Sequence, residues 1–281
     1  MLYEISNGIL SVKINDLGAE ISSVVYNGVE RVWQNDNGSW SGKSPVLFPV
    51  CGNRKVIVDG VDRKIPFHGF ARRSVFKCES AKSDVLTFSL RYNEDTLKVY
   101  PYKFELKITY ALKENAVVIT NAVTDLDEKP MYFALGRHDS FNLPVPVGEC
   151  ALIFDKDEVF SSQQTDETAR LIDSFVDFGS GRKFVLPESF LTNGNTVIFG
   201  GVNSDRVFLK TVDNEPIAEL FFENVRNVLI WRPEGAKMVC VELWSALPDN
   251  SGDNNEVSTD TGFIRLDAKE TKAISLEIKY Y

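Results

Sequence analysis

Short runs of alternating apolar and polar residues, rich in β-branched side chains, recur from one end of this chain to the other. A period of two places every second side chain on the same face of an extended strand, so each run predicts a strand with a buried face. The predicted strands are residues 9–14, 20–26, 85–92, 104–112, 116–124, 131–135, 196–199, 206–210, 218–222, 228–231, 238–242 and 273–280. So many short strands predict an all-β fold.

The segments between these runs predict turns rather than helices. Asn27-Gly28, Asp59-Gly60 and Asp213-Asn214 carry residue types that tight turns favour. Helical periodicity is nearly absent, and residues 165–175 form the best candidate helix. The pattern predicts a large antiparallel β-sandwich or barrel and not a parallel sheet with crossover helices. Because the chain has no linker and no internal repeat, residues 1–281 are expected to form a single domain.

The composition argues against several classes of function. Hydrophobic residues make up 43% and charged residues 25% of the 281 residues, the balance of a soluble globular protein. A formal net charge of −9 argues against nucleic acids and anionic membranes as partners, because both bind basic surfaces. Met1 to Ser6 shows no signal-peptide pattern, and no apolar run approaches the roughly 20 residues that cross a bilayer. A cytoplasmic location is therefore expected.

The cysteines and acidic residues form no metal-binding motif. Cys51, Cys78, Cys150 and Cys240 are widely spaced without a C-x-x-C pair, so free thiols in a reducing compartment are expected. The polar tract at residues 249–261 predicts a solvated loop, and its spacing does not fit an EF-hand calcium loop. Neither a metal nor another cofactor is expected.

The chain contains only two histidines, and histidine is the side chain best suited to donate and accept protons near neutral pH. His68 lies between Phe67 and Gly69, where a core histidine with a satisfied nitrogen is an equal alternative to a functional one. His138 is expected at the exit of the strand predicted at residues 131–135, where an ordinary loop histidine is the alternative. Two histidines also exclude a three-histidine zinc site.

Glu242 lies in an apolar run and shares a strand face with Cys240. Burying a glutamate is costly unless it is paired or functional, although a partly exposed or ion-paired glutamate is the more common case. Desolvation raises the pKa of a carboxyl, so a carboxylate base and an imidazole acid could act together on a small polar substrate. Aromatic faces for a sugar could come from Phe70, Phe141, Trp231 and Trp244, with core packing as the alternative.

Several motifs carry a resemblance to a known family. In chain order they are Gly18-Ala19-Glu20-Ile21, residues 44–54 (SPVLFPVCGNR), residues 67–72 (FHGFAR), residues 100–104 (YPYKF), residues 136–142 (GRHDSFN) and residues 241–244 (VELW). Together they resemble the aldose 1-epimerase (mutarotase) family of the galactose mutarotase-like superfamily, in the bacterial subgroup associated with galactose and lactose metabolism. The resemblance implies a large antiparallel β-sandwich, called a supersandwich, and cofactor-free interconversion of the α and β anomers of a free hexose.

The resemblance also implies roles for individual residues. His138 resembles the general acid that protonates the ring oxygen, and Glu242 resembles the general base that takes the proton of the C1 hydroxyl. Arg54 and His68 resemble residues that hydrogen-bond the sugar, and Asn195 falls near the place of a hydroxyl-binding aspartate. The implied partner is a small-molecule sugar, without metal, nucleic acid or membrane. Whether the protein is a monomer or a homodimer stays open.

The residues beside His138 depart from the family pattern. Arg137 stands where a small residue is usual, and Asp139 stands where proline is common. Asp139 could raise the pKa of the imidazole or point away, and Arg137 would add positive charge beside the pocket. Four interpretations therefore stay open. They are an aldose 1-epimerase, a hexose-6-phosphate epimerase using Arg54, Lys55 and Arg137, a non-catalytic carbohydrate-binding or sugar-sensing protein, and an accessory structural domain.

Overall fold

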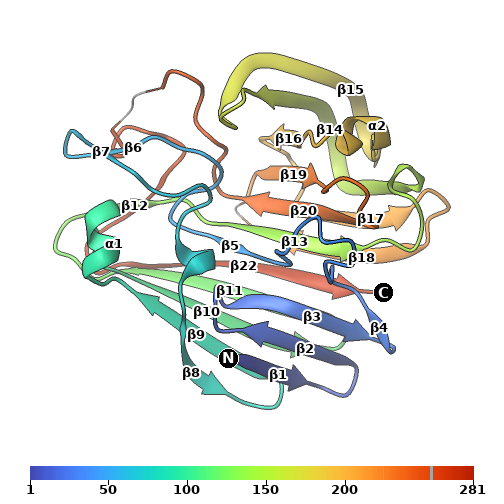
Figure 1. The fold of residues 1–281 in the computed structure, drawn as a ribbon, viewed down its shortest axis with the longest axis horizontal. Helices are drawn as coiled ribbons and strands as arrows, with labels where there is room; N and C mark the ends of the chain where they lie inside the picture. The colour runs from blue at the N-terminus through green and yellow to red at the C-terminus, as the bar shows by residue number, and fades with distance from the viewer. Residues whose placement is uncertain (224, 254–255) are drawn as a thin grey trace.

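The computed structural model describes residues 1–223, 225–253 and 256–281, and these residues form antiparallel sheets with very little helix (Figure 1). The largest sheet has nine strands. In spatial order they are β15 (Leu171–Val185), β14 (Cys150–Thr165), β17 (Arg206–Thr211), β18 (Pro216–Phe222), β22 (Thr271–Tyr280), β11 (Ala116–Asp125), β10 (Phe104–Lys113), β9 (Val85–Arg91) and β8 (Lys77–Ala81). The predicted all-β, antiparallel fold class is confirmed.

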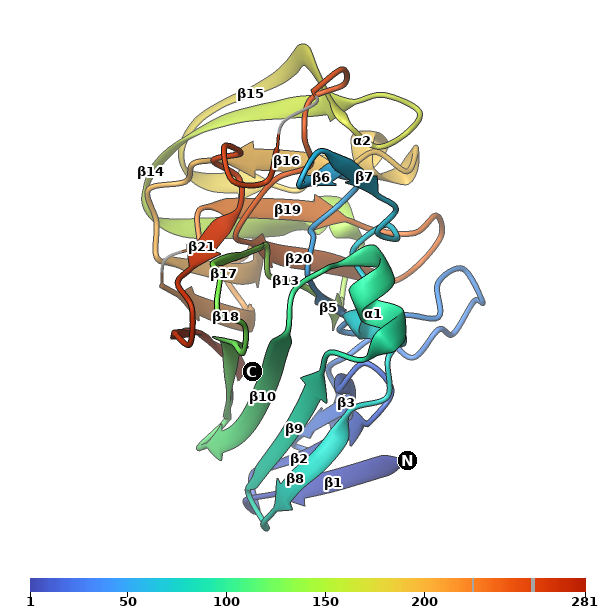
Figure 2. The ribbon, with the colours of Figure 1, turned by 90° about the vertical axis from the view of Figure 1, so that its left-hand side faces the viewer.

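Two further sheets lie against the nine-stranded sheet and form the second layer of a sandwich (Figures 1 and 2). One contains β16 (Val197–Gly200), β19 (Asn227–Trp231), β20 (Met238–Trp244), β13 (Gly136–Asn142) and β5 (Val46–Leu47). The other contains β1 (Leu2–Ser6), β2 (Leu10–Asn15), β3 (Glu20–Tyr26) and β4 (Val29–Glu30). Aromatic contacts join the layers, Phe141 of β13 with Tyr280 of β22 and Tyr3 of β1 with Phe88 of β9.

The remaining elements are short. Two-stranded pairs form from β12 (Met131–Phe133) with β21 (Ile264–Leu266), and from β6 (Val56–Val58) with β7 (Val61–Arg63). The helices are α1 (Glu94–Val99) and α2 (Glu188–Thr192), and none of the described helices is long and apolar enough to cross a membrane. One connected cluster of buried apolar side chains runs through both layers of the sandwich.

Two local predictions from the sequence are wrong, and several strands were not predicted. Residues 165–175 do not form a helix, because Thr165 ends β14 and Leu171 begins β15 in a hairpin. Asp166 Oδ1 accepts hydrogen bonds from the backbone of Thr168 and Arg170, which fixes the turn. Residues 150–164, which belong to β14, and residues 2–6, which form β1, are strands that the sequence pattern did not predict.

His138 does not lie at the exit of a strand, which is the second wrong prediction. The run expected to be one strand at residues 131–135 ends at Phe133, and a new strand, β13, begins at Gly136. Strand β13 pairs with β20 along its whole length, so His138 occupies the interior of a strand in the middle of a sheet. A fixed backbone of this kind aims a side chain more narrowly than a loop does.

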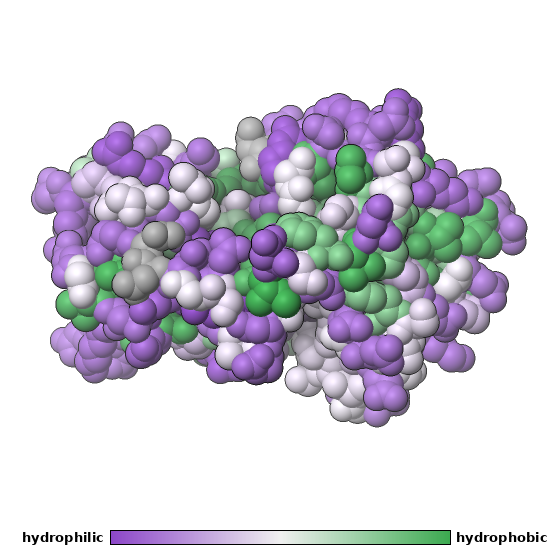
Figure 3. All heavy atoms as spheres, turned by 90° about the horizontal axis from the view of Figure 1, so that it is seen from above, coloured by the Kyte–Doolittle hydropathy of each residue, from purple (hydrophilic) through white to green (hydrophobic). Residues whose placement is uncertain are grey.

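The surface seen in Figure 3 is largely hydrophilic, with apolar side chains showing in a band across its middle. Exposed apolar residues of the long β14–β15 hairpin include Val159, Phe175 and Val185. The polar tract predicted as a solvated loop extends over residues 249–261, of which residues 254 and 255 lie outside the described part of the chain. Its described residues form turns and isolated bridges, and Asp249 is buried where it pairs with Arg170.

The backbone around His68 is shaped by two consecutive residues with positive φ. His68 has φ 64° and Gly69 has φ 75°, and the carbonyl of Phe48 accepts hydrogen bonds from the backbone of Phe70 and Ala71. A Cβ atom on Gly69 would lie 2.0 Å from the Phe48 carbonyl oxygen. This position therefore requires glycine for space as well as for its backbone angle.

The Gly69→Ala variant is expected to be markedly destabilised. A left-handed φ costs alanine about 1–2 kcal/mol, and the overlap with Phe48 adds an overpacking cost of about 1–3 kcal/mol. Gly28→Ala is the matched control, because Gly28 has φ +76° but nothing within 4 Å of its Cβ position. Chemical denaturation of both variants measures the difference, and equal losses would show that the close approach to Phe48 does not matter.

Candidate active site

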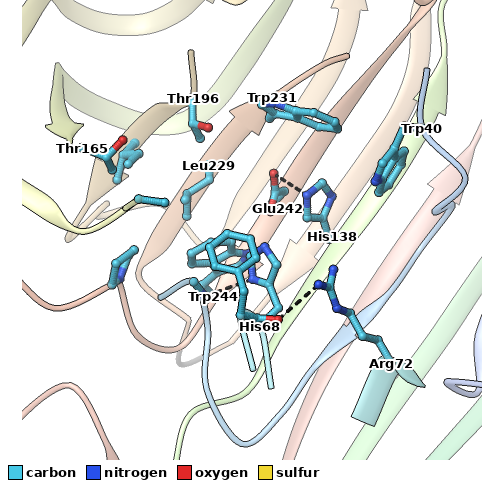
Figure 4. Close-up of a pocket in the computed structure, with 15 residues that line it drawn as sticks. Trp40, His68, Arg72, His138, Thr165, Thr196, Leu229, Trp231, Glu242 and Trp244 are labelled. Atoms are coloured by element: carbon cyan, nitrogen blue, oxygen red, sulfur yellow. Dashed lines mark hydrogen bonds and ion pairs between the residues drawn. The ribbon is translucent and has the colours of Figure 1, made fainter. Parts of the chain in front are cut away.

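A cavity of about 320 Å³ lies on the face of the five-stranded sheet that carries His138 and Glu242, and both histidines line it (Figure 4). Its lining comes from segments far apart in the sequence, and includes Trp40, His68, Arg72, His138, Thr165, Thr196, Leu229, Trp231, Glu242 and Trp244. Most of the wall is aromatic or aliphatic, and the polar groups converge on one region. Such a combination is typical of small-molecule sites.

The antiparallel register of β13 and β20 places His138 directly opposite Glu242. Their side chains meet in the cavity, with His138 Nε2 3.3 Å from Glu242 Oε1. The same register pairs Gly136 with Trp244, and a Cβ on residue 136 would lie 3.0 Å from Trp244 Cδ1. Glycine at this position therefore gives the Trp244 indole room beside the acid–base pair.

Burial shifts the proton equilibria of His138 and Glu242 in opposite directions. His138 is 8% exposed and Glu242 is 2% exposed. Desolvation lowers the pKa of His138 to about 3, and Arg72 adds to that shift. Desolvation raises the pKa of Glu242 well above its ordinary value, against the opposing effect of the Trp244 side chain. Burial thus favours the neutral form of both the imidazole and the carboxyl.

Three buried polar atoms at the site have no hydrogen-bond partner among the described residues. They are His138 Nδ1, Glu242 Oε2 and Trp244 Nε1. Buried polar groups are usually satisfied, because leaving one unpaired costs about 1–3 kcal/mol. Unsatisfied groups that gather in one cavity favour a binding site for a ligand that carries hydroxyl groups.

His68 is held in one orientation by the neighbouring backbone. The ring Nδ1 of His68 accepts a hydrogen bond of 3.0 Å from the backbone N–H of Gly52. The backbone N–H of His68 donates in turn to the Gly52 carbonyl. In the neutral ring the proton must then be on Nε2, which makes that nitrogen a donor. Burial, with His138 and Arg72 nearby, lowers the pKa of His68 well below its ordinary value and keeps the ring neutral.

Arg72 also lines the cavity, and the sequence analysis did not assign it to the site. It lies in a 3₁₀ turn, Ala71–Arg73, and its Nη2 donates to the Phe67 carbonyl at 3.2 Å. Among the described residues, Arg72 forms no ion pair with a carboxylate, whereas the buried Arg137 pairs with Asp139. Its place four residues after His68, in the most specific motif of the chain, was the available signal.

Arg54 and Asn195 lie outside the cavity lining. Arg54 is buried against Phe263, donates to the Leu247 carbonyl and pairs with Asp260 at 2.5 Å. Asn195 is exposed, and its side chain donates to the Phe190 carbonyl at 3.1 Å. Thr196, one residue further on, lines the cavity instead. The structure brings together three of the five predicted site residues, His68, His138 and Glu242.

Arg137 and Asp139 face away from the cavity, which corrects the expectation that Arg137 adds charge beside the pocket. Neighbouring residues on a strand point to opposite faces, so both lie in the interior beneath His138. Arg137 Nη2 is 2.8 Å from Asp139 Oδ1 and 2.6 Å from Ser44 Oγ, and Asp139 also accepts from Ser44. Arg137 is 1% exposed, and Asp139 pairs with it and not with His138.

The aromatic residues predicted as sugar-facing surfaces divide into two groups. Trp231 and Trp244 line the cavity, whereas Phe70 packs against Phe48 and Phe141 packs against Tyr280 in the core. Trp40, whose ring lies over His138, was not predicted from the sequence as a site residue. Within the described ranges, no group of three or more histidine, cysteine or acidic side chains could hold a metal ion.

The chain is thus an all-β sandwich with a buried imidazole–carboxyl pair in a cavity of about 320 Å³. The family model described as aldose 1-epimerase matches residues 1–259, so the chain belongs to the aldose 1-epimerase family. The sequence is 28% identical over 274 residues to the chromosomal protein LacX of Lactococcus lactis subsp. lactis, covering 91% of each chain.

Solved structures give the same family relationship. A galactose mutarotase related enzyme from Lactobacillus acidophilus matches with a TM-score of 0.91 and 26% identity, over 100% of this chain and 97% of the other. A galactose mutarotase-like protein from Lactobacillus casei matches with a TM-score of 0.92 and 25% identity, over the full length of both chains. The fold expected from the resemblance is thereby established.

The Glu242→Gln variant is expected to be more stable than the wild type at alkaline pH. A carboxyl whose pKa is raised by folding contributes stability below its unfolded pKa, and that contribution is lost as pH rises towards the folded pKa. Glutamine does not titrate, so the advantage of the variant should be small near pH ~4 and larger near pH ~8. Thermal unfolding at both pH values measures it, with Glu234→Gln, an exposed change, as the control.

The difference in thermal unfolding midpoint between Glu242→Gln and the wild type should be larger at the higher pH. A difference that does not grow would contradict a raised pKa for Glu242. Such a result would mean that the carboxyl ionises as readily in the cavity as in the unfolded chain.

Proposed function

We propose that this protein is an aldose 1-epimerase that interconverts the α and β anomers of a free hexose or related sugar. The observation that carries the proposal is the contact of 3.3 Å between His138 and Glu242 at the wall of an aromatic cavity. Epimerisation at C1 needs one group that protonates the ring oxygen and one that takes the proton of the C1 hydroxyl. A buried imidazole beside a buried carboxyl supplies both.

The pair carries one exchangeable proton when both groups are neutral, because the carboxyl is protonated and the imidazole is not. Moving that proton from Glu242 to His138 gives the reactive form, an imidazolium beside a carboxylate. His138 then donates its proton to the ring oxygen while Glu242 accepts the proton of the C1 hydroxyl. The bond between C1 and the ring oxygen breaks, and the C1 carbonyl forms.

Ring closure reverses these transfers after rotation about the C1–C2 bond. Glu242 returns its proton to the carbonyl oxygen, and His138 takes the proton of the ring hydroxyl as that oxygen attacks the other face of C1. No proton is gained or lost over the cycle, so the reaction needs no co-reactant. The neutral pair that burial favours stores the proton that the reaction uses.

The surrounding residues suit the orientation of a sugar. His68 is oriented by Gly52 so that its Nε2 is the free donor, and Trp244 has an unpartnered indole N–H. Trp231 and Trp244 offer apolar faces for the C–H side of a pyranose ring. Arg54 and Asn195 lie outside the cavity lining and have no part in this proposal.

Loss of mutarotation on changing the pair tests this function. His138→Ala and Glu242→Gln should each reduce the rate of α to β interconversion by about 100-fold or more, since each removes a proton-transfer group. Polarimetry with fresh α-glucose or α-galactose measures the rate, and Glu234→Gln is the matched carboxyl control. Wild-type rates equal to buffer, with saturable sugar binding by calorimetry, would favour a non-catalytic sugar-binding protein instead.

A sugar phosphate is the second candidate substrate, and Arg72 is the observation that favours it. None of Arg54, Lys55 and Arg137 lines the cavity, so Arg72 is the guanidinium available there among the described residues. If the substrate is phosphorylated, Arg72→Met should reduce kcat/KM for glucose 6-phosphate by at least about 10-fold more than for glucose, because charge-assisted bonds to phosphate are strong. Exchange NMR measures both, and equal losses would favour the free sugar.

A further inference from the structure

The indole ring of Trp40 packs against the imidazole of His138, which the proposed reaction uses. Its ring centroid lies 5.0 Å from that of His138 with an interplanar angle of 30°, so the indole presents its face to the imidazole (Figure 4). Trp231 meets His138 edge-on at 5.6 Å and Trp40 edge-on at 5.4 Å. Trp40 lies between β4 and β5, far in sequence from both strands of the acid–base pair.

The chain around Trp40 is built to hold the indole in this place. Trp33, 1% exposed, donates from its Nε1 to the Trp40 carbonyl at 2.9 Å, and Asn35 Oδ1 accepts from the Trp40 N–H. A Cβ atom on Gly42 would lie 2.5 Å from Trp40 Cζ2. The backbone therefore passes under the indole only because residue 42 has no side chain.

Among the charged and titratable groups around His138, Glu242 supports an imidazolium only when its carboxyl is ionised. Glu242 is 3.3 Å away on β20, while Arg72 disfavours a positive charge and His68 lies edge-on at 5.8 Å. Asp139 on the same strand favours the charge but is already paired with Arg137. An aromatic face attracts a cation without competing for the proton, and Trp40 supplies such a face.

We propose that Trp40 is a positioning residue that stabilises the protonated imidazole of His138 through its ring face. An effect of Trp40 on catalysis rests on the proposed function. An effect of Trp40 on the protonation of His138 does not depend on that function. The same contact fixes the plane of the His138 ring, because the indole on one side and Trp231 at the edge restrict rotation.

Trp40→Phe and Trp40→Leu form the matched test, because both keep apolar cover over His138 and only phenylalanine keeps a ring face. NMR titration of the imidazole should give a lower pKa for His138 in Trp40→Leu than in Trp40→Phe. The two-histidine spectrum is assigned with His138→Gln. A cation–π contact of roughly 0.5–2 kcal/mol corresponds to a loss in kcat of about 2- to 30-fold in the leucine variant relative to the phenylalanine variant, with KM nearly unchanged.

Gly42→Ala provides a second route, because it displaces the indole without changing its chemistry. Gly42→Ala should lower kcat, as Trp40→Leu does. Ser41→Ala, an exposed change in the same loop, should leave kcat unchanged. Equal His138 titrations in the phenylalanine and leucine variants, or a loss confined to KM, would overturn the proposal. If the wild type shows no mutarotation but the titrations differ as expected, the proposed function fails and the role of Trp40 stands.

Discussion

Antiparallel pairing of β13 with β20 is the constraint on which the site depends. The pairing sets Gly136 against Trp244 and His138 against Glu242. Neither side chain could reach the other if the register slipped by one residue, because a slip turns every side chain to the opposite face. The small residue at 136 is part of the same constraint, since its missing side chain leaves space for Trp244 and for Cys51 beneath it. The backbone hydrogen bonds between the two strands therefore fix the relative position of His138 and Glu242.

The two faces of β13 carry side chains with different surroundings. His138 faces the cavity, while Arg137 and Asp139 form a buried ion pair that also engages Ser44 and Tyr110. A buried pair of this kind is expensive to form but very costly to break, because removal of one partner leaves an uncompensated charge. The charged residues beside His138 therefore lie in the interior between the layers. Neither Arg137 nor Asp139 lines the cavity, so neither is placed to contact a substrate there.

Much of the fold was predictable because a strand with one buried face shows its period directly. Residues 104–112 and 116–124 were predicted almost as they occur, since β10 and β11 alternate buried and half-buried side chains. Prediction failed for β14 and β15, where polar residues and bulges obscure the period along a twisted hairpin. Local sequence also could not place Arg54 and Asn195. Arg54 pairs with Asp260, more than 200 positions away, and the exposed Asn195 donates to the carbonyl of Phe190 in the preceding helix α2.

The sequence by itself determined the fold class and the family, because strand periodicity and motif order are local properties of a chain. It also singled out the histidine and the glutamate that the structure brings together in the cavity. Only the tertiary structure decided which charged groups face the cavity and which face the core. That choice depends on strand register and on partners distant in sequence, as for Arg137, Arg72 and Arg54. The position of Trp40 over His138 also depends on the tertiary structure. It requires a loop near the N-terminus to pack over a strand that lies about 100 residues further along the chain.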